Sequence, residues 1–544
     1  MILKTKMISS LEKVFCDEEL KAAEFNYGNA LRGEIYSFQL AYYSDELNSP
    51  LTIEVESELK DYITIRSVEL VPCEFTGYDF DDNVLRTAPG LYPDPLMPID
   101  GLRNVARQWR SLWIKVAIPA DCTPGDYEIK LSLSLTAKKH NLSKRATFKL
   151  EVMSPLLPKQ KLIHTQWFHA DCIFTQYGVE CWSEAHWILL DKYIRNAAKH
   201  GINMLLTPLW TPPLDTDVDG ERPTVQLLDI KKAGANYSFD FTRLERWIKL
   251  AIDAGIEYFE MAHLFTQWGA KCCPKIIVHE SGVAKKLFGW HTAATSEEYR
   301  NFLNQLLPAL KIFLKEQHIF DHCYFHLSDE PDMANIDSYR AARDIVKALL
   351  SDCKIIDALS KVEFYDQGLI EHPIPANDHL EPFIERNISN LWTYYCVSQY
   401  DKVPNRFFIF PSTRNRIMGV LMYKYNIAGF LHWGFNFWYT QYSINQKIDP
   451  FKVTDSGHAF GGGDPFLVYP GPDGPIDSLK YEVHYEALQD LRVLQLLESK
   501  IGRQATLDIL EAELDTPLSM TEYPNSATWL LDIRSKLNHY ITQV

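Results

Sequence analysis

Two adjacent carboxylates, Asp329 and Glu330, are the residues whose types and spacing are best suited to chemistry. They close the stretch 321–331, which begins as a short apolar and aromatic run and ends at Pro331. Burying a carboxylate is costly, and neighbouring like charges push their pKa values apart, so one carboxyl can keep its proton while the other is ionised. The pair therefore predicts general acid chemistry.

The place of the pair in a secondary-structure element decides whether both side chains can reach one pocket. The apolar run predicts a buried strand that ends at Asp329 and Glu330. Successive side chains of a strand point to opposite faces, so adjacent residues share a pocket only where the strand ends and the chain turns. Pro331 supplies such an end. The alternative is that the two carboxylates only begin a helix, where the helix dipole favours them.

A barrel is the architecture that we expect to position the pair. From residue 156 onward strands alternate with amphipathic helices, which predicts a parallel sheet with helical crossovers. Strands are expected at Leu162–Asp171, Ile202–Pro208, Ile256–Leu264, 321–331, Lys354–Leu359, Pro373–Ala376, Leu391–Cys396 and Ile427–Gly434. Helices are expected at Trp182–His200, Phe241–Ala254, Ser296–Glu316 and Ile336–Leu350. The pattern predicts a (β/α)8 TIM-type barrel over residues 156–477, with the pair at the end of its fourth strand, where barrel enzymes carry their working residues.

Other predicted strand ends carry aromatic and polar residues suited to holding a sugar. Aromatic walls with a few polar groups are typical of a carbohydrate pocket. Each such residue is equally compatible with a place in the core. The candidate substrate-binding residues are Trp167, His169, Asp171, Trp210, His263, Tyr394, Tyr395, Trp433, Asn436 and Trp438, with Glu260 as a further carboxylate.

Two flanking segments complete the predicted domain organisation. Residues 1–155 contain strand-length apolar or alternating runs such as Glu34–Tyr43 and Ser111–Ile118, which predict a β-sandwich. The segment 478–544 is helix-like, with strong periodicity over Tyr481–Ser499, and is expected to pack on the barrel.

Composition excludes several classes of partner. The 71 acidic and 55 basic residues give a net charge of −16, and there is no long Lys/Arg block, which argues against nucleic acid and anionic membranes. We find no convincing signal peptide and no apolar run of membrane-spanning length. The ten cysteines form no disulfide framework and no Cys-x-x-Cys pair, so a reduced, cytoplasmic location is expected. No cofactor is predicted, and the oligomeric state is not indicated.

Two loop motifs have competing interpretations. Asp215–Glu221 resembles the start of a calcium loop, but position twelve is Gln226 and no helix pair frames it, so a solvated loop over the barrel mouth is the alternative. Gly461–Asp464 follows polar sequence rather than a strand, which predicts a flexible turn and no dinucleotide site.

Several phrases of the sequence resemble glycoside hydrolase family 123, the N-acetyl-β-galactosaminidases. The likeness covers nearly the whole chain and includes the Asp-Glu motif itself. The phrases that carry it are Arg32–Gln39, Thr123–Tyr127, Phe325–Pro331, His432–Trp438, Gly462–Pro470 and Ser478–Leu491. The Asp-Glu pair also resembles that of the family 20 hexosaminidases.

The resemblance implies different roles for the two carboxylates. Glu330 would be the general acid, and Asp329 would hold the 2-acetamido group of the substrate, whose carbonyl oxygen attacks the anomeric carbon. It implies a retaining, exo-acting β-N-acetylhexosaminidase that acts on an oligosaccharide or glycolipid-derived glycan with a terminal β-linked N-acetylhexosamine. Tyr395, Trp433 and Trp438 are the candidates for lining the acetamido pocket.

Two alternatives stay open at this point. One is a conventional two-carboxylate glycosidase in which Glu330 works with a distant carboxylate such as Glu260 or Asp171. The other is a carbohydrate-binding protein without catalysis. The sequence does not separate galacto from gluco preference.

Overall fold

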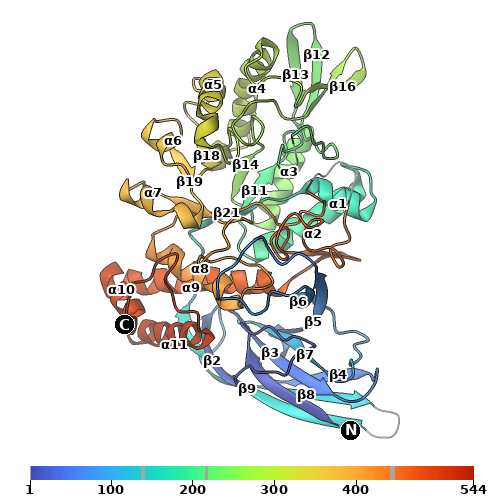
Figure 1. The fold of residues 1–544 in the computed structure, drawn as a ribbon, viewed down its shortest axis with the longest axis vertical. Helices are drawn as coiled ribbons and strands as arrows, with labels where there is room; N and C mark the ends of the chain where they lie inside the picture. Colours follow the sequence, from blue (N-terminus) through green and yellow to red (C-terminus); the bar gives the residue numbers. More distant parts are fainter. Residues whose placement is uncertain (1, 137–140, 215–217, 442–446) are drawn as a thin grey trace.

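The protein is built from a β-sandwich, a parallel barrel and a group of C-terminal helices that contacts both (Figure 1). The computed structural model describes residues 2–136, 141–214, 218–441 and 447–544. The predicted multidomain fold class is confirmed. The boundaries predicted at residues 155 and 477 stay predictions; the last long strand of the sandwich ends at Leu156, and the first C-terminal helix begins at Leu479.

The sandwich consists of two sheets that face each other across an apolar core. In β8 (Gly125–Thr136) the side chains of alternate residues from Ile129 to Leu135 are buried, as expected for a strand with one covered face. Phe38 and Phe148, one from each sheet, stack with ring centroids 4.0 Å apart. One sheet has the order β1 (Leu3–Ser9), β3 (Ile35–Ser44), β7 (Gln108–Ala117), β5 (Ile63–Cys73) and β6 (Gly90–Met97). The other has the order β2 (Tyr27–Arg32), β9 (Asn141–Leu156), β8 and β4 (Leu51–Glu56).

The barrel has parallel strands in the order expected of a (β/α)8 fold. A parallel bridge between Ala376 and Tyr394 connects the two edge strands, β19 and β20, and so closes the barrel. Each predicted barrel strand is present but shorter than its expected range. Around the barrel the strands are β10 (Ile163–Gln166), β11 (Met204–Thr207), β14 (Tyr258–Met261), β17 (Cys323–Phe325), β18 (Lys354–Ala358), β19 (His372–Ile374), β20 (Trp392–Tyr394) and β21 (Gly429–His432).

The helices around the barrel agree with the four that the periodicity predicts, and further ones appear. Serine side chains cap two of the predicted helices, where Ser183 accepts from the His186 amide and Ser296 from the Tyr299 amide. The described helices of this region are α1 (Ala170–Tyr177), α2 (Glu184–Lys199), α3 (Thr242–Ala254), α4 (Glu297–Glu316), α5 (Ile336–Val346), α6 (Glu363–Asp366), α7 (Glu381–Glu385) and α8 (Ser412–Lys424).

Two small sheets decorate the barrel. The larger one lies at the top of Figure 1. Its strands, in spatial order, are β13 (Asn236–Asp240), β12 (Asp229–Ala233), β15 (Ile276–Glu280) and β16 (Val283–Phe288). The smaller one is the hairpin β22 (Tyr469–Gly471) and β23 (Gly474–Ile476).

The C-terminal helices connect the barrel to the sandwich. The long helix α9 (Leu479–Ile501) packs on α8, a helix of the barrel region, which agrees with the packing expected from the sequence. Helix α10 (Arg503–Glu511) follows it. In addition, α11 (Ala527–Gln543) packs on β2 and β9, where Asn538 Nδ2 donates to Asn29 Oδ1 over 2.9 Å. No helix in the described ranges has an apolar run long enough to cross a bilayer.

Candidate active site

The carboxylate pair lies in a turn beyond the fourth barrel strand rather than at its last residues. β17 ends at Phe325, so the expected strand over 321–331 is too long at both ends. The Asp329 carbonyl accepts from the Trp268 amide over 2.7 Å, and the Glu330 amide donates to the Ala358 carbonyl over 2.9 Å. These bonds tie the pair to the loop that follows β14 and to the last residue of β18.

The backbone of Glu330 explains how both side chains reach one cavity. Its φ of 41° lies in the left-handed region that non-glycine residues rarely adopt. This conformation interrupts the alternation of an extended chain, and Asp329 and Glu330 both line the same cavity. Strained backbone of this kind persists where the surrounding structure holds it, and it concentrates at functional sites.

The cavity has a volume of about 170 Å³, and five of its thirteen described lining residues are aromatic. Three of the residues predicted to bind substrate line it together with the pair: Trp167, Tyr394 and Trp433. None of the described lining residues is Lys, Arg or His, and Asp329 and Glu330 are the only carboxylates among them. The remaining lining residues are Gln267, Trp268, Ala358, Cys396, Val397, Leu431, Gln441 and Phe460.

Glu330 is in a setting that favours its protonated form. Burial raises the pKa of Glu330 above its usual range, and hydrogen bonds from Tyr394 and Cys396 offset this only in part. The Tyr394 hydroxyl donates to Glu330 Oε1 over 2.7 Å. The charge of Asp378 adds to the upward shift. A raised pKa is what a carboxylic acid needs to act as a proton donor near neutral pH.

A buried ionic triad adjoins the cavity wall at Trp167 and consists of Glu260, His326 and Asp357, all fully buried. His326 Nε2 contacts Glu260 Oε1 at 2.5 Å, and His326 Nδ1 contacts Asp357 Oδ1 at 3.2 Å. Burial opposes a charge on His326, but the two carboxylates outweigh it and raise its pKa to about 9. Trp167 Nε1 and Thr165 Oγ1 each donate to Glu260 over 2.7 Å. Glu260 is therefore engaged on both oxygens.

Three of the predicted substrate-binding residues have protein partners away from this cavity. The Asp171 carboxylate forms a buried ion pair with Arg222, at 2.7 Å between Oδ1 and Nη2. Arg222 Nη2 also donates to His169 Nδ1, and His169 Nε2 contacts the Trp433 carbonyl, both at 2.8 Å. The Asn436 side chain bonds to the His169 backbone. These contacts join the ends of β10 and β21 to the loop before β12.

The other four predicted residues are core residues in the structure. Trp210 donates to the His263 carbonyl, and Trp438 donates to the Val468 carbonyl. The His263 ring stacks on His326 with centroids 4.1 Å apart. The Tyr395 ring lies against Phe430 and His432. None of the four lines the cavity of the pair, so their substrate-binding role stays a prediction that no described contact supports.

Sequence reasoning missed two features of the site. Gln267 and Trp268 line the cavity from the loop after β14, where no strand or helix pattern marks them, and Trp268 is 41% exposed. Asp464 is fully buried, and its Oδ2 accepts from Trp433 Nε1 over 2.9 Å, so it fixes one aromatic wall. The turn expected at Gly461–Asp464 is present, but all four of its residues are buried, which an exposed flexible turn would not show.

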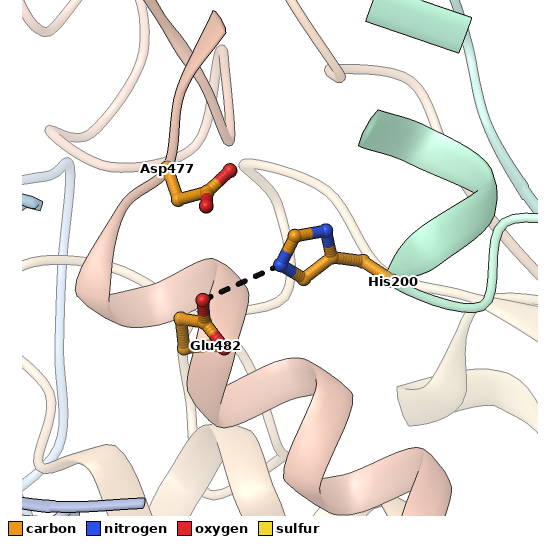
Figure 2. A group of neighbouring side chains, drawn as sticks. All are labelled: His200, Asp477 and Glu482. Atoms are coloured by element: carbon orange, nitrogen blue, oxygen red, sulfur yellow. Dashed lines mark hydrogen bonds and ion pairs between the residues drawn. The ribbon is translucent and has the colours of Figure 1, made fainter. Parts of the chain in front are cut away.

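One described group could hold a metal ion by geometry. His200, Asp477 and Glu482 offer ligand atoms within 4.8 Å of one another (Figure 2). Lys115 Nζ, however, lies 2.7 Å from Glu482 Oε1, so an ammonium group already supplies the positive charge. None of its three residues lines the cavity, and the cluster lies where the sandwich, α2 and α9 meet. In the stretch Asp215–Glu221, which resembles the start of a calcium loop, residues 215–217 lie outside the described residues. At its far end, Glu221 pairs with Lys275 and Lys286.

Comparisons with known proteins point to one family. The family model "Glycoside hydrolase 123, catalytic domain" matches residues 167–497. A family 123 glycoside hydrolase from Clostridium perfringens, studied for glycolipid glycan hydrolysis, is similar over 100% of this chain and 98% of its own, with a TM-score of 0.75 and 17% identity.

More distant likenesses carry no functional argument. β-Glucuronidases from Parabacteroides merdae and Bacteroides uniformis have TM-scores of 0.31 and 0.30 at 10% and 9% identity. Each match covers 89% of this chain and 52% or 51% of the glucuronidase. None of the curated proteins matches the sequence.

Proposed function

Because the chain belongs to glycoside hydrolase family 123, we propose that this glycoside hydrolase releases terminal β-linked N-acetylhexosamine, preferring N-acetylgalactosamine, with retention and by substrate-assisted catalysis. The observation that carries the proposal is the turn at Glu330, which brings two adjacent carboxylates to one aromatic cavity with no third carboxylate among its described lining residues. The glycan chemistry named for the Clostridium perfringens relative supports the same class of substrate.

The two carboxylates divide the work. Protonated Glu330 gives its proton to the glycosidic oxygen as the bond between that oxygen and the anomeric carbon breaks. The 2-acetamido oxygen of the sugar forms the new bond to that carbon, giving a cyclic oxazolinium ion, while Asp329 accepts from the acetamido N–H. Water then attacks the anomeric carbon, and Glu330 takes a proton from the water. The bond between the acetamido oxygen and the anomeric carbon breaks in the same step. The two inversions together retain the configuration.

The conventional two-carboxylate mechanism needs a second carboxylate within reach of the sugar. The two that the sequence offers are both engaged elsewhere. Asp171 is 1% exposed and paired with Arg222, and Glu260 is fully buried and accepts from Trp167, Thr165 and His326. The non-catalytic alternative is set aside because the chain is a glycoside hydrolase.

A panel of aryl β-glycosides tests the proposal. The turnover rates of the N-acetylgalactosamine, N-acetylglucosamine, galactose and glucuronic acid glycosides, all with the same aryl leaving group, are compared. We expect turnover of the N-acetyl sugars, fastest for the galacto form, and none of the glucuronide, whose carboxylate would meet a cavity without a described cation. Equal turnover of the plain galactoside would replace the acetamido mechanism with the two-carboxylate one.

Glu330→Gln tests the acid role in the same assay. Loss of the proton donor should reduce turnover of a phenyl glycoside by about 10²- to 10⁴-fold. The loss should be much smaller for a dinitrophenyl glycoside, whose leaving group departs without a proton. An equal loss on both substrates, with the melting temperature unchanged, would remove Glu330 from this role.

A further inference from the structure

The triad of Glu260, His326 and Asp357 carries one net negative charge whichever atoms hold its protons. Both ring nitrogens of His326 face carboxylate oxygens, so each of the two links needs a proton. Two carboxylates and one imidazole with a proton in each link sum to −1, whether the ring is charged or one carboxyl is protonated. With one proton in each link, the net charge is the same for either placement of those protons.

The donors around the triad favour the form with two ionised carboxylates. Trp167 Nε1–H can only donate, and it donates to Glu260 Oε1. The amides of Leu327 and Ser328, which also can only donate, reach Asp357 Oδ1 at 2.9 and 3.3 Å. The Tyr339 hydroxyl donates to Asp357 Oδ2 at 2.6 Å. The raised pKa of His326 agrees with this form.

The triad is joined to the cavity through two adjoining residues, Trp167 and Ala358. Glu260 holds the indole of Trp167, a cavity wall, and that indole lies edge-on to the His326 ring with centroids 6.2 Å apart. Asp357 precedes Ala358, which lines the cavity and accepts the Glu330 amide. No Lys, Arg or His among the described lining residues compensates the charge.

The groups packed against the triad leave its charge in place. His263 stacks on His326 and is neutral, because burial first and the charge of His326 second hold the pKa of His263 well below its usual range. Thr165 and Tyr339 contribute only hydroxyl donors. The excess negative charge thus sits in a fully buried site, where electrostatic interactions are screened less than in water.

We propose that Glu260, His326 and Asp357 form a positioning element whose net negative charge, held next to the cavity wall, favours the positively charged sugar of the transition state over the neutral substrate. The triad also holds the Trp167 wall and, through Asp357, the two residues before Asp329. The inference rests on the proposed function for the identity of the sugar, but the sign of the charge applies to any glycosyl cation. Glu260 is thus a positioning residue and not the nucleophile of a two-carboxylate mechanism.

The experiment compares two inhibitors that differ in charge. A protonated piperidine analogue of N-acetylgalactosamine and the neutral lactam of the same ring are titrated into the full-length wild type and into Glu260→Gln. The Gln side chain can accept from both Trp167 and His326 only when its amide oxygen takes the Oε1 position. In that orientation His326 keeps its proton, and the triad loses one negative charge. The affinity for the cation should fall about tenfold more than the affinity for the lactam.

A matched variant separates charge from shape. Thr165→Val removes a donor to Glu260 Oε2 and leaves the triad charge unchanged, so it should alter both affinities by the same factor. Asp357→Asn removes a negative charge from the other side of His326 and is the second charge-removing variant. It takes the place of Glu260→Gln if the Glu260 variant does not fold, and the affinity for the cation should again fall more than the affinity for the lactam. Equal losses for both inhibitors in the charge-removing variants would overturn the proposal.

The same assay distinguishes this inference from the proposed function. If the wild type hydrolyses only the plain galactoside, the proposed function fails, and the piperidine and lactam without the acetamido group are used instead. A selective loss of affinity for the cationic inhibitor in Glu260→Gln would then still support the proposed role of the triad charge. A fall in kcat with little change in KM for Glu260→Gln is expected in either case, because only the transition state carries the charge.

Discussion

Asp329 and Glu330 are neighbours in the chain with different surroundings. Glu330 accepts a hydrogen bond from the Tyr394 hydroxyl, and burial raises its pKa and so favours its protonated form. The Asp329 carbonyl accepts a hydrogen bond from the Trp268 amide, and the residue, which lines the cavity, is 8% exposed. One turn therefore presents two carboxylates that can take unlike roles.

Asp329→Asn tests the proposed hold on the acetamido group. A thiazoline analogue, which mimics the cyclic intermediate, should lose roughly 10- to 100-fold in affinity, because a hydrogen bond to a charged group is replaced by a neutral one. Calorimetric titration measures it. The matched control is Asp332→Asn, an exposed carboxylate three residues later that caps a short helical turn, a role that Asn can keep. Unchanged affinity in Asp329→Asn would contradict acetamido anchoring.

Tyr394→Phe tests how the pKa of Glu330 is set. The Tyr394 hydrogen bond lowers the pKa of Glu330, so its removal should raise that pKa further. Since the acid works in its protonated form, the basic limb of kcat/KM should move to higher pH. The neighbouring Tyr395→Phe is the control, because the Tyr395 hydroxyl has no hydrogen-bond partner among the described residues and should leave that limb in place. A limb that does not move in Tyr394→Phe would mean that Glu330 does not set it.

At the scale of elements, strand ends were harder to predict than strands. The barrel strands were recognisable as short apolar runs between helices, but those runs continue past the last ladder hydrogen bond, as at Phe325. The side chains beyond that point follow loop geometry, which no alternation predicts. This is why His169 and Asn436 bond to each other instead of lining the cavity.

The helix α8 was not predicted for a related reason. Nearly all of its residues are buried, including Arg414 and Arg416, so its sequence has no polar face and no helical period. Arg416 is matched by Glu486 and Asp490 of α9. Helix α9 is predicted from its periodicity, but its pairing with α8 through charges at distant positions leaves no local signal in the α8 segment.

The glycine turn before Asp464 gives a prediction at this scale. A Cβ on Gly462 would lie 2.4 Å from Cys73 Sγ, because the turn passes closely over the end of β5. Gly462→Ala should therefore destabilise the protein by about 1 to 3 kcal/mol. It should also raise KM, since Asp464 holds the Trp433 wall. Urea unfolding and steady-state kinetics measure the two effects. Gly90→Ala, where a Cβ meets nothing within 4 Å, is the control, and equal stability of the two variants would mean that the turn is loosely packed.

At the scale of the whole molecule, buried ion pairs join the three parts of the chain. Glu482 on α9 contacts Lys115 on β7 of the sandwich and His200 at the end of α2, as Figure 2 shows for the histidine. Arg534 on α11 pairs with Glu34 before β3 and with Asp490 on α9. These contacts set how the sandwich is held against the barrel.

Glu482 makes the stability of this junction depend on pH. Burial opposes its charge, but Lys115 and His200 together outweigh burial and lower the pKa of Glu482 from 4.5 to about 2. A group whose pKa is lowered by folding contributes stability that is complete above its unfolded pKa and is lost as the pH falls through its folded pKa. The contribution of Glu482 should therefore be complete at pH 7 and disappear between pH 4.5 and 2.

Glu482→Gln isolates that contribution. The variant should lose roughly 3 kcal/mol of unfolding free energy at pH 7, and the difference from the wild type should shrink toward zero as the pH approaches 2. Chemical unfolding at a series of pH values measures it. Glu56→Gln is the control, because its partner Arg145 is 57% exposed and surface ion pairs contribute little. A difference that stays constant with pH would show that the Glu482 side chain stabilises the junction by packing and not by its charge.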